Sequence, residues 1–202
     1  MAKFHTLKDL NILKYDGRKI CISSPEGKPM RIQTPRMYMP FGVSGFVPQV
    51  GPTKWNLDFS MKGYDEEDNY VKQFHDTIEA TEKSIIEEVS NQSVDIFGKH
   101  MSYDELLPMF NSNIKHSVGH DPKFRVKVDT TPDGNIKAGI FNSERKSINT
   151  SAEDKLYSRN SGVAIVEIGT VYFLNRKFGV TWKLHQLVVY EPQQLKGFQF
   201  IL

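Results

Sequence analysis

Cysteine is almost absent from this chain. Cys21 is the one thiol among 202 residues, so no disulfide can form within the chain, and a reducing compartment is favoured. Free cysteine is commonly buried. We therefore interpret Cys21, which lies in an apolar-rich run at 19–23, as a small core residue of a strand.

Long apolar runs are also missing. No segment approaches the roughly 18 apolar residues that a membrane helix needs. The start of the chain, Met1 to His5, lacks the apolar region of a secretory signal. We expect a protein that contacts no membrane and is not secreted, and that works in the cytoplasm, in the nucleus or in a virus-infected cell.

Sequence signatures of catalysis and of cofactors are missing as well. The chain has no Gly-x-Gly-x-x-Gly, no P-loop and no nucleophile elbow. His116 and His120 have the spacing of a metal-binding helix, but Gly119 and Pro122 disfavour a helix there and no further ligand pattern completes a site. We expect no enzyme, no catalytic residue, no cofactor and no metal. A catalytic site assembled from distant residues stays open.

The composition that remains is typical of a globular protein. Hydrophobic residues make up 39% and charged residues 25% of the chain, which is enough apolar mass for a core. The length suits one domain. We expect a single domain over 1–202, with strands in 1–63, a helical insertion in 65–110 and strands in 122–202.

The first stretch has the pattern of short strands. We expect strands at Lys19–Ser23, Met30–Thr34 and Lys54–Met61, and the last of these alternates apolar and polar side chains. Pro35 and Pro40 frame an extended aromatic segment between them. Because proline cannot donate to a sheet ladder, we do not expect this segment in a central strand.

A long acidic helix follows. Its apolar stripe has helical spacing and consists of Val71, Phe74, Ile78, Ile85 and Val89. Asp65 is the expected N-cap. Residues 65–99 contain ten acids and three bases. A short second helix is expected at Ser102–Phe110, with Ser102 as its cap and Glu105 completing a capping box.

The last stretch returns to strands. Lys123–Asp129 and Asn135–Phe141 flank a strong turn and predict one hairpin. Val163–Leu174 and Phe178–Tyr190 predict a second hairpin around the turn at 175–177. Residues 143–162 are polar and predict a mobile loop, and Phe198–Leu202 could add an edge strand.

This order predicts an α+β fold that is mainly β. We expect an OB-fold-like barrel, with the long acidic helix between its third and fourth strands and with an extra C-terminal hairpin. The expectation is an analogy of architecture, because many α+β folds share the order.

The charges separate along the chain. The helix takes many of the acids and leaves the β part basic, and a basic surface attracts polyanions. In the strand at 123–128, Phe124 and its apolar partners should face the core while Lys123, Arg125 and Lys127 share the outer face. Three cations in a row repel each other unless an anion lies across them. An ordinary solvated face explains the pattern equally well.

The last hairpin and the loops supply further candidates. In 178–190 we expect Val188 and Tyr190 on the core face with Trp182, and Lys183 on the outer face as a phosphate contact. Single-strand binders also need aromatic faces for stacking. The candidates outside core patterns are Tyr38, Phe41, Phe46 and Tyr157, with Arg145, Lys146 and Arg159 in the polar loop. Local packing under a loop is the alternative for each aromatic.

One segment resembles a known family. The residues from Gln33 to Ser44, with Thr34-Pro35 and Pro40-Phe41-Gly42 as their most specific part, are followed by Trp55–Ser60, the acidic helix, the strand at 124–128 and the terminal hairpin. Over most of its length the chain is similar to the single-stranded-DNA-binding proteins of nucleocytoplasmic large DNA viruses. The resemblance implies an OB-fold that coats single strands in viral DNA replication or repair, in the host cytoplasm or nucleus. It transfers no site residue.

One departure from phage and bacterial binders stands out, because the chain ends in Gln199–Leu202 without an acidic tail. The leading hypothesis is a binder of single-stranded DNA without sequence preference, and RNA as ligand and a homo-oligomer stay open. The second hypothesis is a structural or scaffold protein of a virion or assembly that binds other proteins. The third is an enzyme with an unrecognised site.

Overall fold

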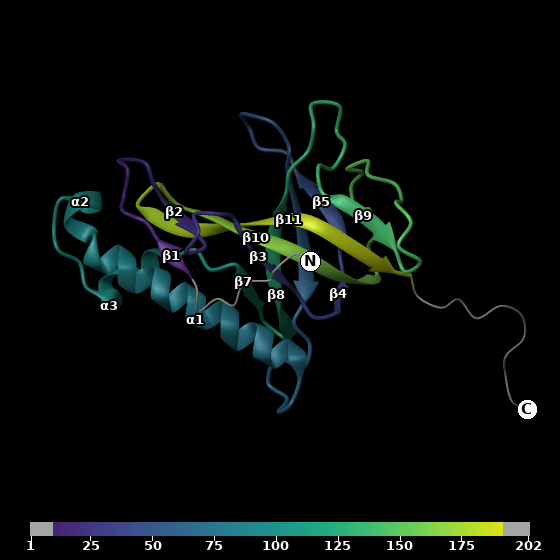
Figure 1. The fold of residues 1–202 in the computed structure, drawn as a ribbon, viewed down its shortest axis with the longest axis horizontal. Helices are drawn as coiled ribbons and strands as arrows, with labels where there is room; N and C mark the ends of the chain where they lie inside the picture. Colours follow the sequence, from purple (N-terminus) through teal and green to yellow (C-terminus); the bar gives the residue numbers. More distant parts are fainter. Residues whose placement is uncertain (1–9, 192–202) are drawn as a thin grey trace, which may run out of the picture.

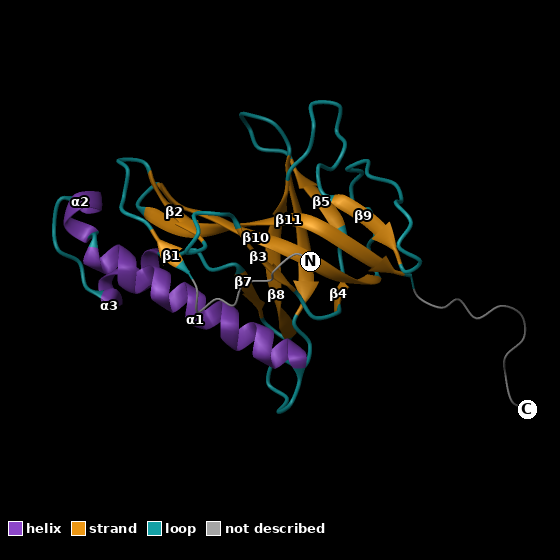
Figure 2. Ribbon diagram, in the orientation of Figure 1, coloured by secondary structure: helices purple, strands orange, loops and turns teal. Residues whose placement is uncertain are grey.

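The computed structural model describes residues 10–191. Strands dominate, and one cluster of buried apolar side chains links them to the long helix (Figure 1; Figure 2). The strands are β1 (Asn11–Ile12), β2 (Lys19–Ser23), β3 (Met30–Gln33), β4 (Met37–Met39), β5 (Val43–Phe46), β6 (Lys54–Ser60), β7 (Ile114–Ser117), β8 (His120–Val128), β9 (Gly139–Asn142), β10 (Asn160–Leu174) and β11 (Lys177–Tyr190). The helices are α1 (Tyr70–Asn91), α2 (Ser93–Phe97) and α3 (Tyr103–Leu106), followed by the 3-10 turn η2 (Leu107–Met109).

Five strands close into a barrel. Their order around the ring is β4, β6, β8, β11 and β10, and β10 then pairs with β4 again. All neighbours are antiparallel except β8 and β11, which are parallel. This is the closed Greek-key arrangement of an OB-fold, so the expected fold class is confirmed.

The position of the helix in that order differs from the expectation. Strands β2, β3 and β4 do not pair with one another but lie end to end along β10, with Cys21 opposite Thr170, Arg31 opposite Glu167 and Tyr38 opposite Ser161. They are pieces of one interrupted first strand. The acidic helix therefore follows the second barrel strand, β6, and the expectation of a helix between strands 3 and 4 was wrong.

The proline-framed segment also differs from the expectation. Strand β4 is central, because it pairs with β10 on one side and with β6 on the other. Its three residues lie between Pro35 and Pro40 and so include neither proline. The short length of β4 lets the two prolines stay outside the ladder. Cys21 lies in a strand as expected, but it is partly exposed while Ile20 and Ile22 fill the core.

The C-terminal hairpin is confirmed, and its two strands are barrel strands four and five. It is therefore part of the ring and not an addition to it. The two-residue turn Asn175–Arg176 has φ values of 50° and 60°, which are the left-handed values that a tight hairpin turn requires. The far part of the hairpin extends to β2, near α2 (Figure 1).

A β-bulge in β11 changes which side chains face the core. Ile165 is paired with Gln186 and the next residue, Val166, with Leu184, so His185 is the extra residue. The alternation shifts there by one residue. Leu187 and Val189 are buried, whereas Val188 and Tyr190 face outward. The expectation that Val188 and Tyr190 face the core was wrong, and Tyr190 instead lies under the Arg36 guanidinium at 4.2 Å.

The other expected hairpin forms only at its tip. Thr130 and Ile136 make an isolated bridge around the turn. Beyond it the chain leaves β8, and β9 pairs in parallel with β11. The turn at 130–137 and the loop at 47–53 project from the same end of the barrel (Figure 1).

Helix α1 packs its apolar stripe on the sheet. All five residues expected in the stripe are buried, and the Phe74 ring makes an edge contact with Phe124 of β8 at 5.2 Å between centroids. The helix begins later than expected. Asn69 is its N-cap and accepts from the Val71 amide, so the assignment of Asp65 as N-cap was wrong.

The capping box of Ser102 and Glu105 is present as expected. The expected edge strand at 198–202 lies outside the described residues. Within 10–191, no helix combines the length and apolarity needed to cross a bilayer.

Candidate nucleic-acid interface

Strand β8 presents its cations on the outside of the barrel. Phe124, Val126 and Val128 are buried, and Lys123, Arg125 and Lys127 alternate with them on the other face. The expected separation along this strand is confirmed. Because α1 contacts β8 through Phe124 on the core side, the cationic face is not covered by the acidic helix.

A groove of about 1270 Å³ is lined by residues of β6, β8 and β11, which include outer residues such as Arg125 and core-side residues such as Val128. Arg125 and Lys127 line its middle, and the loop at 47–53 and the turn at 130–134 border it. Five further cationic or aromatic residues that line it were not predicted as binding residues, namely Lys54, Trp55, Lys115, Lys137 and Tyr172. Trp182, which was expected on the core face, is buried and also lines the groove. The second and third strands of an OB barrel form the face that binds oligonucleotides and oligosaccharides in this fold.

Arg125 has an internal partner. Its Nε and one terminal nitrogen donate to the two carboxylate oxygens of Asp58 at 2.7 and 2.8 Å. These hydrogen bonds raise the pKa of Arg125. Asp58 is only 5% exposed. The idea that the cations of β8 need an external anion was therefore incomplete, because an acid on β6 already faces Arg125.

Lys127 has an internal partner too. Its ammonium lies 2.7 Å from one oxygen of Asp129, and the ammonium of Lys183 lies 3.0 Å from the other. Lys127 and Lys183 are register partners of the parallel β8–β11 pair. Burial raises the pKa of Asp129, but hydrogen bonds from the two lysines outweigh it and lower the pKa below the ordinary value.

The aromatic candidates Tyr38, Phe41 and Phe46 are all exposed, with exposed fractions of 46%, 49% and 61%. Tyr38 and Lys123 are both register partners of Ser60. The Lys123 ammonium lies 5.2 Å from the centroid of the Phe41 ring. Tyr38, Phe41 and Lys123 therefore gather beside one end of β8, while Phe46 lines the groove.

Lys115 adds a cation from β7. Its ammonium donates to the side-chain oxygen of Asn111 at 2.8 Å, and the side-chain nitrogen of Asn111 donates to the Tyr172 hydroxyl at 2.9 Å. Burial, followed by the nearby Arg125 charge, lowers the pKa of Lys115. A phosphate in the groove would counter both effects, because an anion favours the charged form of lysine.

A buried acid ties the helix to the groove. Glu82 of α1 accepts a hydrogen bond from the Asn113 amide at 2.8 Å, and the Asn113 side chain donates to the Arg125 carbonyl at 3.0 Å. Burial is the main cause of the raised pKa of Glu82. Helix α1 therefore holds the segment from which Lys115 extends.

The polar loop packs against the chain after β4. Tyr157 is half-buried, and its hydroxyl donates to the Asn149 carbonyl. Arg145 is exposed at a turn, Lys146 pairs with Glu144 at 2.9 Å, and the Arg159 amide donates to the Met39 carbonyl. None of these four loop residues lines the groove, so closure of the loop over a bound strand stays a prediction.

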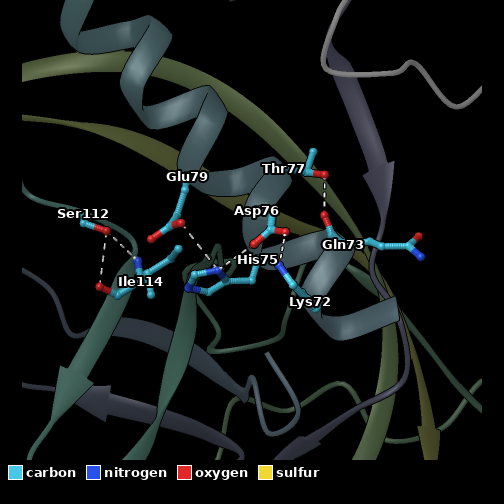
Figure 3. Close-up of polar contacts among 8 residues, drawn as sticks. All are labelled: Lys72, Gln73, His75, Asp76, Thr77, Glu79, Ser112 and Ile114. Atoms are coloured by element: carbon cyan, nitrogen blue, oxygen red, sulfur yellow. Dashed lines mark hydrogen bonds and ion pairs between the residues drawn. The ribbon is translucent and has the colours of Figure 1, made fainter. Parts of the chain in front are cut away.

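A second polar cluster lies on α1 (Figure 3). The buried His75 places Nδ1 3.5 Å from Asp76 and 3.7 Å from Glu79. These three side chains could approach one cation. However, Lys72 already pairs with Asp76 at 2.6 Å, and both acids are exposed to water. We assign no ligand to this cluster.

No family model matches the chain, and no curated protein matches it. Similar solved structures include the single-stranded DNA-binding protein from bacteriophage Enc34 in complex with ssDNA, with 12% identity over 94% of this chain and 99% of that one, and a TM-score of 0.45. Another is gp2.5, a single-stranded DNA-binding protein encoded by bacteriophage T7. It has 11% identity over 85% of this chain and 91% of its own, and a TM-score of 0.47. Both likenesses are distant.

Proposed function

We propose that the chain binds single-stranded DNA along the groove, without sequence preference. The observation that carries the proposal is the groove itself, which brings Lys115, Arg125 and Lys127 together with the aromatic side chains of Phe46 and Trp55. Cations neutralise backbone phosphates, and aromatic faces stack on any base. We propose binding and not catalysis as the activity.

The composition of the groove favours a single strand over a duplex. Stacking requires bases that are free of their pairing partner, and each stacked base contributes about 1–3 kcal/mol. Phe46 and Trp55 are available for this from β5 and β6, with Tyr172 on the hairpin side. Tyr38 and Phe41 would extend the track beyond Lys123.

The biological setting belongs to the proposal as well. The resemblance at 33–44 supports a role in viral DNA replication or repair. We further propose one domain over 1–202, and contacts from Arg145, Lys146, Tyr157 and Arg159 when the loop closes.

One observation favours the second candidate, a scaffold or structural protein. Val47 and Val50 are 75% and 91% exposed in the loop beside the groove. Exposed apolar side chains of this kind suit a contact with another protein.

The test is an anisotropy titration with labelled oligo-dT, a matched duplex and a matched RNA at several salt concentrations. Binding to the single strand should weaken with salt, with a log–log slope of about −0.7 per phosphate neutralised. The triple substitution K54Q/K115Q/K127Q should flatten the slope. It leaves Arg125 in place, because Arg125 neutralises a buried acid.

The matched control is K28Q/K83Q/K99Q, which removes the same charge from exposed positions outside the groove. It should leave the slope closer to that of the wild type. Stacking is read separately from tryptophan fluorescence, and comparison with W55F separates the response of Trp55 from that of Trp182, which is buried but also lines the groove. Salt-independent or absent binding would reject the proposal and favour the scaffold.

A further inference from the structure

Two carboxylates pair with cations of the groove, and their settings differ. Asp129 lines the groove, whereas Asp58 and the second partner of Asp129, Lys183, are not among its lining residues. Asp58 is 5% exposed and receives both hydrogen bonds from one guanidinium. The Asp129 side chain is 32% exposed and is shared between two ammonium groups. The first carboxylate is fixed by burial, whereas the second can be reached from solvent.

The geometry at Asp129 is that of a bridge between two strands. Lys127 reaches one carboxylate oxygen from β8, and Lys183 reaches the other from β11. The two ammonium groups converge because their residues are register partners of the parallel strand pair. An anion with two oxygens is therefore already held between them.

A phosphodiester offers the same feature, because it carries one negative charge over two non-bridging oxygens. Partly exposed ion pairs contribute little free energy, and each lysine here keeps 40% or more of its side chain exposed. Exchange of one such anion for another therefore costs little. A buried bidentate pair such as that of Asp58 would not exchange in this way.

We propose that Lys127 and Lys183 form a phosphodiester subsite that the Asp129 carboxylate fills when no nucleic acid is bound. Binding exchanges that carboxylate for a backbone phosphate, so Asp129 competes with the ligand and limits affinity. The inference rests on the proposed function of the groove. It adds a position for one phosphate and a residue that opposes binding.

The test compares D129N with D133N in oligo-dT titrations. Asp133 lies in the adjoining turn and is exposed, so the two variants remove the same charge from nearly the same place. D129N should bind about two- to fivefold more tightly than the wild type at low salt, with a salt slope steeper by about 0.7. D133N should show a clearly smaller gain.

A cycle with Lys127 adds a second readout. K127Q should weaken binding more in the D129N background than in the wild type, because the lysine is unpaired there. Equal affinities of D129N and D133N would overturn the exchange while leaving the proposed function intact. A wild-type chain that binds no oligonucleotide would instead reject the proposed function.

Should D129N fail to fold, the wild-type protein still provides a test. NMR signals of the Lys127 and Lys183 ammonium groups should move together when oligo-dT is added. A methylphosphonate oligomer of the same sequence, which lacks the phosphate charge, should leave them unchanged. Signals that stay unchanged with oligo-dT would contradict the subsite.

Discussion

Asp58 and Arg125 are register partners in β6 and β8, and their side chains meet in a two-point hydrogen-bonded ion pair on the outside of the barrel. The two members of the pair are unequally buried. Asp58 is almost completely covered, while 45% of the Arg125 side chain is exposed. The pair therefore holds a groove cation in a fixed orientation and keeps a buried acid neutralised.

Because the two members are unequally buried, we expect their substitution by alanine to lower the free energy of unfolding by unequal amounts. R125A leaves a buried carboxylate without a partner and should lower the free energy of unfolding by about 3 kcal/mol or more. D58A leaves a cation that water can reach and should cost only about 1–2 kcal/mol. Urea unfolding measures both values. The double variant is the control and should lie close to D58A, and equal costs for the two single variants would contradict the assignment.

Glu82 predicts a dependence of stability on pH. Burial raises its pKa above the model-compound value of 4.5, so the folded state binds this proton more tightly than the unfolded state does. The stabilisation by the protonated carboxyl is complete below about pH 4.5 and is lost as the pH rises through the folded-state pKa.

The matched variant is E82Q, whose side-chain oxygen can still accept from the Asn113 amide. From about pH 4 to about pH 7, the stability of the wild type should fall relative to that of E82Q. Urea midpoints at the two pH values measure the difference. An unchanged difference would show that the buried carboxyl carries no such penalty.

At Gly42, beside the polar loop, we expect that no larger side chain can be accommodated. Its φ is +62°, and a Cβ there would lie 2.2 Å from the Leu156 carbonyl oxygen and 2.3 Å from the Ser158 nitrogen. G42A should therefore cost clearly more than the roughly 1–2 kcal/mol of a left-handed alanine, and it should expose Lys155 and Arg159 to trypsin.

The control for Gly42 is G51A. Gly51 also has a positive φ, +99°, but a Cβ there meets nothing within 4 Å. G51A should lower the free energy of unfolding only by the cost of a left-handed alanine. Similar thermal unfolding for the two variants would mean that the loop does not pack on Gly42 in solution.

Local patterns in the sequence predicted local structure well. The alternation at 123–128 correctly placed Lys123, Arg125 and Lys127 outside, and the helical spacing from Val71 to Val89 correctly identified the buried face of α1. Both signals depend only on the period of one element. The turn at Asn175–Arg176 was predictable because its signal is also local: it lies between two runs of strand residues.

Relations between strands were not predictable in this way. Strand register brings Asp58 to Arg125 and Lys183 to Lys127, and no single-strand pattern encodes register. The outward position of Asp58 could be read from its alternation with Leu57 and Phe59, but its partner could not. The bulge at His185 shifted the alternation without any proline or glycine to mark it.

The barrel closes late along the chain. Its first three strands are complete by Val128 and pair through β6, but only the final hairpin, β10 and β11, joins the outer edge of β4 to that of β8 and closes the ring. A nascent chain that has not passed Asn160 therefore leaves open edges on both sides of the half-built sheet, and such edges recruit other strands. Closure must wait for β10 and β11, so the growing chain is most vulnerable to aggregation between the synthesis of β8 and that of the hairpin.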